Sequence, residues 1–71
     1  MTKLAPVEGR KLTKILCNKF GFKVIRQKGS HATLTNDTIY VTIPQKEIQI
    51  GLLNVILHDC GITRDEFLNE L

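Results

Sequence analysis

A short run in the middle of the chain combines residue types suited to proton transfer and to phosphate binding. It reads Arg-Gln-Lys-Gly-Ser-His over residues 26–31. A histidine imidazole can accept or donate a proton near neutral pH, and cations beside it can hold a phosphodiester in place. The run therefore indicates a site in which His31 acts on a phosphodiester held by Arg26 and Lys28.

The same run also has a simpler interpretation as a hairpin turn. Lys28-Gly29-Ser30 is a turn sequence, and a histidine after it can be an ordinary polar residue on an exposed strand face. These six residues alone favour the hairpin, because Gly-Ser turns are common. The rest of the chain shifts the balance.

RNA is the phosphodiester that such a site can cleave without a metal ion, because its own 2′-OH is the nucleophile. The reaction needs a base for that hydroxyl, an acid for the departing 5′-oxygen and positive charge for the phosphate. We expect His31 to be the base or the acid. Arg26 and Lys28 supply the charge, and the turn amides of Gly29 and Ser30 are expected to donate to the phosphate.

The other reactive side chains give no second site. A metal-dependent nuclease needs clustered carboxylates, whereas the first acid after the turn is Asp37, in the next hairpin. Cys17 and Cys60 lack the spacing of a zinc site. We expect both to be reduced thiols that serve only in packing. His58 is expected on the surface of a helix. We therefore expect neither a metal ion nor a cofactor.

Charge is divided unevenly along the chain. Residues 1–31 contain eight of the ten Lys and Arg and a single acid, which gives a net +7. Residues 32–71 contain two bases and six acids, which gives −4. This asymmetry is typical of a basic surface that meets a polyanion, next to an acidic tail.

The length of 71 residues predicts one small domain over 1–71, because so short a chain buries only about 60% of its unfolded surface. Its site should lie on an open surface and act on a polymer or a partner. The start lacks the apolar stretch of a signal peptide, and the longest uncharged run, residues 48–57, is shorter than the ~20 residues of a membrane span. We expect a cytoplasmic protein with no membrane segment.

The apolar periodicity predicts an α+β fold in the order helix, three strands, helix. These elements span about residues 8–19, 22–27, 31–35, 39–43 and 50–58. Gly61 ends the second main helix, which is expected to supply most of the core cover. A capping box formed by Thr63 and Glu66 then predicts a short C-terminal helix.

The strands should form a three-stranded antiparallel sheet with both main helices on one face. Asn36-Asp37 is expected to be a two-residue turn within it. The inner face is expected to carry Ala32, Leu34, Ile39, Val41 and Ile43, and the outer face His31, Thr33, Thr35, Tyr40 and Thr42. Arg26 joins the outer face if Ile25 points into the core. Such a surface suits a sugar-phosphate backbone.

The ordered set of motifs resembles the HicA family of toxins, also called YcfA-like, which are small bacterial and archaeal mRNA interferases. The matching features follow the chain from the first helix to its end. They are Gly21-Phe22, the run 26–31, Val41-Thr42-Ile43-Pro44, Lys46-Glu47-Ile48, Gly51-Leu52-Leu53, Ile56-Leu57 and the ending 61–67.

This resemblance implies a fold similar to a double-stranded-RNA-binding domain and metal-independent cleavage of mRNA, with His31 as the catalytic residue between Gly-Ser and the strand. It also implies a HicB-type antitoxin that binds and blocks the toxin in a type II toxin–antitoxin pair. One departure stands out. Many members have a histidine shortly after the strand-ending Pro, where this chain has Gln45-Lys46-Glu47; if that histidine assists catalysis, activity is reduced here.

The leading hypothesis is thus an endoribonuclease toxin whose partners are RNA and an antitoxin protein. The alternative is a non-catalytic RNA-binding module that uses the same cations. A third hypothesis is a protein-interaction module whose basic surface meets an acidic partner.

Overall fold

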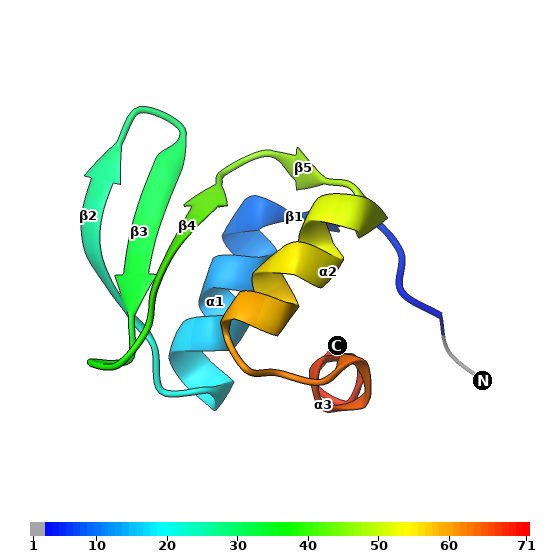
Figure 1. The fold of residues 1–71 in the computed structure, drawn as a ribbon. Helices are drawn as coiled ribbons and strands as arrows, with labels where there is room; N and C mark the ends of the chain where they lie inside the picture. The colour runs from blue at the N-terminus through cyan, green and yellow to red at the C-terminus, as the bar shows by residue number, and fades with distance from the viewer. Residues whose placement is uncertain (1–2) are drawn as a thin grey trace.

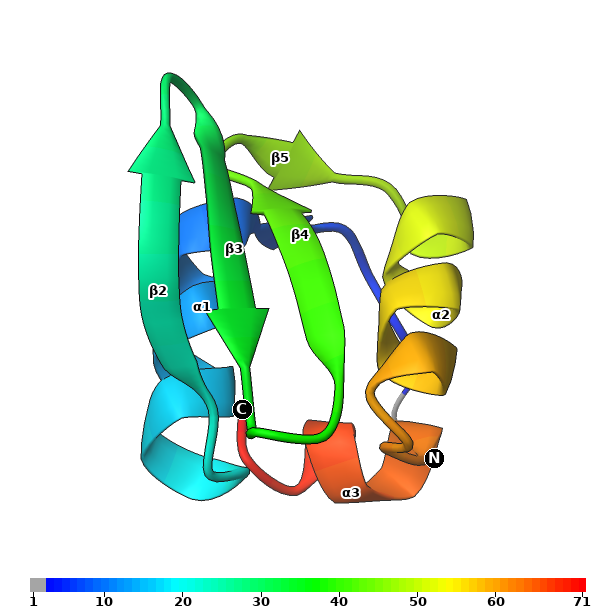
Figure 2. The same ribbon diagram turned by 60° about the vertical axis from the view of Figure 1, so that its left-hand side comes forward.

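The computed structural model describes residues 3–71 and contains a three-stranded sheet with helices on one of its faces (Figures 1 and 2). The elements are β1 (Val7–Glu8), α1 (Gly9–Lys19), β2 (Lys23–Lys28), β3 (His31–Thr35), β4 (Tyr40–Pro44), β5 (Glu47–Ile48), α2 (Ile50–Asp59) and α3 (Arg64–Leu68). The sheet is antiparallel in the order β2-β3-β4. The predicted α+β architecture is confirmed.

Helix α1 forms because its apolar residues recur on one side. Leu12, Ile15 and Leu16 are buried against the sheet layer, whereas the helix's lysines, at positions 11, 14 and 19, are exposed. The chain leaves the helix at Gly21, whose φ of +74° lies in the left-handed region that favours glycine. Phe22 is then buried as the chain turns into β2.

The C-terminal end of the chain closes the core. The predicted capping box is present at α3: Thr63 Oγ1 accepts from the N–H of Glu66 at 3.1 Å, and the Thr63 N–H donates to Glu66 Oε1 at 2.9 Å. The hydrogen bond from the Thr63 N–H to the carboxylate lowers the pKa of the Glu66 carboxyl, and the Thr63 side chain lowers it further. The capped helix buries Phe67, which is only 1% exposed.

The second main helix was expected to contribute most of the apolar side chains that cover the core, and this expectation is wrong. Helix α2 buries Leu53, Ile56 and Leu57, the same number of apolar side chains as the three on α1. Its other apolar side chains lie half in solvent. These are Ile50, Leu52 and Val55, which are 41%, 46% and 54% exposed.

The connection between β3 and β4 is longer than the predicted two-residue turn. The Asn36 side-chain oxygen accepts from the N–H of Ile39 at 2.8 Å, so β4 begins only at Tyr40 and Ile39 is half-buried in the loop. Thr35 lies on the outer face by its register, opposite Lys23 and Tyr40, but it is buried at 3% exposure. Its hydroxyl explains this position, since it donates to Ile39 O at 2.8 Å and accepts from the Asp37 N–H at 3.0 Å.

A second, two-stranded sheet was not predicted. Strand β1 pairs antiparallel with β5, with Val7 opposite Ile48 and Glu8 opposite Glu47. Val7 and Ile48 are buried, so this small sheet extends the core beyond β4. Within residues 3–71, no helix combines the length and the apolar character needed to cross a membrane.

The first residue of α1 lies directly against the end of β4. The Gly9 N–H donates to Lys46 O at 2.8 Å, and a Cβ added at Gly9 would lie 1.7 Å from Pro44 O. That neighbour is backbone and cannot rotate away, so only glycine fits. Gly51 offers the contrast, because nothing lies within 4 Å of a Cβ added there.

This contrast predicts opposite effects of the same substitution. Gly9→Ala should lower the free energy of unfolding by about 1–3 kcal/mol, the usual cost of forced overpacking. Gly51→Ala, in a helix with open space around it, should raise it by about 0.5–1 kcal/mol. Urea denaturation followed by circular dichroism measures both. A Gly9→Ala protein as stable as the wild type would show that the close approach to Pro44 is not a constraint.

Candidate active site

The β2–β3 turn places the predicted site at one end of the sheet. Lys28 ends β2 and His31 begins β3, and the two residues are directly opposite in the ladder. Gly29 has a φ of +60°, a conformation that glycine adopts without steric cost. All four residues of the turn, including Ser30, are exposed.

Cross-strand pairing arranges the outer face of the sheet, the face turned away from the helices, in three rows. The rows are Lys28–His31–Pro44, Arg26–Thr33–Thr42 and Lys23–Thr35–Tyr40. Residues directly opposite each other share a face and have Cβ atoms about 4.5–5.5 Å apart. The three cations of β2 therefore form one column beside the column that begins with His31.

A β-bulge at Ile25 brings Arg26 to this face. Val24 pairs with Leu34, but Arg26 pairs with Thr33, so Ile25 is an extra residue in β2. In a continuous register Arg26 would lie opposite Ala32, on the buried face, because a shift of one residue exchanges the two faces of a strand. Arg26 thus joins His31 although Ile25 is 47% exposed and does not fill the core.

The segment after β4 holds the turn from behind. The backbone N–H of Gln45 donates to Ser30 O, and its side-chain Nε2 donates to Thr13 Oγ1 at 2.9 Å and to Ile43 O at 3.1 Å. Gln45 thereby connects the turn that carries His31 to the body of α1. In the sequence this position stands out only as a departure from the family pattern, because its hydrogen-bond partners are distant in the chain.

The electrostatics of this end are positive. Helix α1 begins at the end of the molecule where the β2–β3 turn lies (Figures 1 and 2), and its first turn contains Arg10 and Lys11 but no acid. The N-terminus of a helix also carries the positive end of its dipole. At the other end of the sheet, Lys23 Nζ lies 3.4 Å from an Asp37 carboxylate oxygen.

Arg26, Lys28 and His31 are available to a ligand. Within residues 3–71 the two cations form no ion pair, and the His31 imidazole makes no hydrogen bond. All three side chains are exposed on the outer face. The arrangement offers one titratable imidazole beside fixed positive charge, on a surface open enough for a polymer.

The remaining candidate groups lie elsewhere. Burial, followed by the charge of Asp59, raises the pKa of the Cys60 thiol to about 11, so it stays protonated as a packing residue. Cys17 is half-buried against the core. His58 is exposed in the last turn of α2, which belongs to the helix layer and not to the sheet. Among residues 3–71, no group of three or more His, Cys, Asp and Glu could hold a metal ion.

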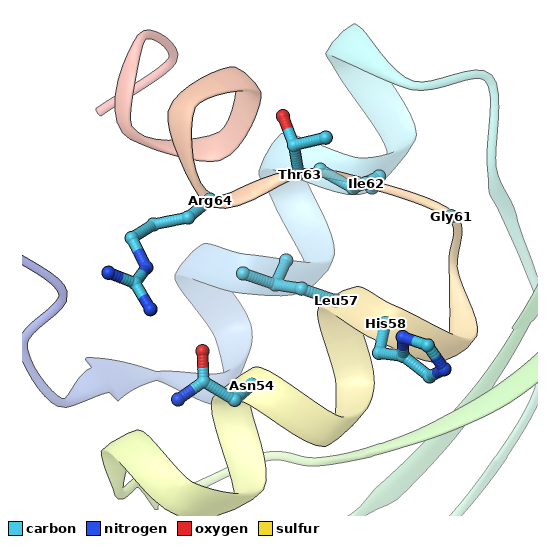
Figure 3. A pocket seen from close by; sticks show the side chains of 7 residues that line it. All are labelled: Asn54, Leu57, His58, Gly61, Ile62, Thr63 and Arg64. Atoms are coloured by element: carbon cyan, nitrogen blue, oxygen red, sulfur yellow. The ribbon is translucent and has the colours of Figure 1, made fainter.

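A separate pocket lies between α2 and α3 (Figure 3). It has a volume of about 370 Å³ and is lined by Asn54, Leu57, His58, Gly61, Ile62, Thr63 and Arg64. This pocket could not be predicted from the sequence, because it depends on how α3 is placed relative to α2. It lies in the helix layer, apart from the outer face of the sheet.

Comparison with known proteins gives a family for the chain. The family model described as the HicA toxin of bacterial toxin-antitoxin matches residues 9–62. Searches of curated proteins and of solved structures found no match. The matched region begins at Gly9, includes the β2–β3 turn and Gln45, and covers about three quarters of the 71 residues. The chain therefore belongs to the HicA family, the toxins of bacterial toxin–antitoxin pairs.

Proposed function

We propose that this toxin is a metal-independent endoribonuclease that cleaves mRNA with His31 as general acid or base. The observation that carries the proposal is the position of His31 on the outer face, opposite Lys28 and one row from Arg26. The proton-transfer group thus lies on the same face of the sheet as two unpaired cations, directly across the ladder from one and one row from the other. The reaction supplies its own nucleophile, so the protein has only to bind the phosphate and move protons.

The substrate phosphate would lie over the β2–β3 turn. Lys28 and Arg26 neutralise its charge, and the amides of Gly29 and Ser30 are further donors. Attack of the 2′-oxygen on phosphorus breaks the bond to the 5′-oxygen, which leaves a 2′,3′-cyclic phosphate and a 5′-hydroxyl. His31 takes the proton of the 2′-OH or gives one to the departing oxygen.

The same face accounts for control by a partner. Toxin–antitoxin families pair each toxin with an antitoxin, and we propose a HicB-type protein that covers His31 and Lys28 with a complementary acidic surface. An antitoxin in this position would exclude RNA by occupying its binding surface. Action on mRNA places the toxin in the cytoplasm.

The alternative is an RNA-binding module that does not cleave. One observation favours it: His31 is the only histidine on the outer face among the described residues, whereas cleavage requires both a base and an acid. Tyr40, the other titratable side chain outside the cation column, lies two rows away. Cleavage by purified protein decides between the two functions.

The first prediction concerns His31 itself. His31→Ala should lower the cleavage rate by roughly 10²–10⁴-fold, because it removes a proton-transfer group, while RNA binding changes little. His58→Ala, which removes an exposed histidine from α2 and not from the sheet, should cleave at the wild-type rate. Cleavage should persist in a metal chelator, and DNA should resist because it lacks the 2′-OH.

Gel-resolved cleavage of a labelled RNA, with circular dichroism to confirm folding, measures these effects. A folded His31→Ala protein that cuts at the wild-type rate would remove His31 from the mechanism. If pure wild-type protein binds RNA and never cuts it, the binding-module function replaces the nuclease.

The second prediction concerns the cation column. Replacing Arg26 and Lys28 with Ala should weaken binding to single-stranded RNA and reduce the slope of log K against log salt by about 1.4, since two fewer counterions are released. The measurement is best made in the His31→Ala background, where the RNA stays intact. Lys19→Ala is the control, because Lys19 lies at the far end of α1 near Glu70. An unchanged slope in the double variant would place both cations outside the interface.

The third prediction concerns Gln45 as a positioning residue. Gln45→Ala removes the hydrogen bond to Thr13 behind the turn, so kcat should fall roughly 10- to 100-fold through misplacement of His31, with KM nearly constant. Gln49→Ala is the matched control, since that amide contacts only exposed Glu47. Thr13→Val should reproduce the effect, and combining it with Gln45→Ala should add little. A loss of stability with unchanged kcat would assign Gln45 a purely structural role.

A further inference from the structure

The pocket between α2 and α3 has an apolar floor and polar walls. Leu57 and Ile62, which form the floor, are 3% and 8% exposed. Figure 3 shows the side-chain ends of Arg64 and Asn54 on the same side of Leu57, one from the start of α3 and the other from α2. The pocket thus combines a buried hydrophobic base with two side chains that converge on its opening.

Neither of these polar side chains is engaged by the protein. Within residues 3–71, Arg64 forms no ion pair and Asn54 and Arg64 make no side-chain hydrogen bond. A guanidinium group binds a carboxylate through two parallel hydrogen bonds, and an amide can add a third donor. The complementary ligand is therefore a single carboxylate attached to an apolar body.

The surrounding charge distinguishes a protein from RNA as the occupant. Asp59, Asp65 and Glu66 lie next to the pocket in sequence, within a part of the chain whose net charge is −4. A polyanion would be repelled there, whereas one carboxylate on a folded partner would be held by Arg64. Ile50, which is 41% exposed and lies one turn before Asn54 on the same side of α2, adds an apolar contact that a protein can match and a sugar-phosphate backbone cannot.

We propose that this pocket is a docking point for the antitoxin protein, which inserts an Asp or Glu side chain between Arg64 and Asn54 and places apolar side chains against α2. The occupant follows from the family, which pairs this toxin with an antitoxin, and the proposal does not depend on cleavage by His31. The antitoxin then holds the toxin at two places, the outer face of the sheet and the helix layer. Two linked contacts bind more tightly than either alone.

The test is the affinity of the toxin for the protein encoded by the adjacent reading frame, measured by titration calorimetry. Arg64→Ala should weaken this complex at least about tenfold by removing a charged hydrogen-bond donor. Asn54→Asp, which keeps the size of the side chain and adds a negative charge in the pocket, should weaken it as much. Lys14→Ala is the control, since it removes the same charge from an exposed position on α1 outside the pocket.

RNA binding and cleavage by the same variants complete the experiment. Wild-type values for RNA with a weakened antitoxin complex support the proposal. Affinities for the antitoxin within twofold of the wild type in both variants, or no complex with the wild-type toxin, overturn it, and a selective loss of RNA affinity would identify RNA as the occupant instead. Absence of cleavage by every protein would count against the nuclease function alone, because the calorimetry contains no RNA.

Discussion

Two consecutive residues, Gln45 and Lys46, join the layers of this molecule. The Gln45 N–H bonds to the β2–β3 turn at Ser30, and Lys46 O receives the first N–H of α1, from Gly9. Helix and hairpin are therefore both attached to one short connection, which continues directly into β5. Since Gly9 leaves no room for a side chain against Pro44, the start of α1 has one position relative to the sheet. The candidate site lies at this fixed end.

Much of the fold could be predicted because its signals are local. The spacing of Leu12, Ile15 and Leu16 defines α1, and the reciprocal bonds of Thr63 and Glu66 define the start of α3, within a few residues in each case. The pairing of β1 with β5 could not be predicted, since it involves two residues on each side and depends on contacts between distant parts of the chain. The Gln45–Thr13 bond, which spans 32 positions, is hidden from the sequence for the same reason.

The bulge at Ile25 is the feature of the site that the alternation of apolar residues could not predict. Val24 and Ile25 are both apolar, so alternation cannot say which of them continues the inner face, and the side of Arg26 depends on that choice. The sequence of α2 likewise does not show which of its apolar residues are buried. Six of its ten residues are apolar, and only the position of its neighbours determines that Leu53 is buried while Val55 is not.

Strand β2 is the open edge of the three-stranded sheet, and its six residues are all exposed. A free edge of this kind can recruit the same strand of a second molecule and so extend the sheet into an aggregate. Here, joining two copies through β2 would bring Lys23, Arg26 and Lys28 of each onto one face beside the same three cations of the other, and the bulge would interrupt the new ladder. The charges suited to a polyanion thus also oppose the pairing of two copies through this edge.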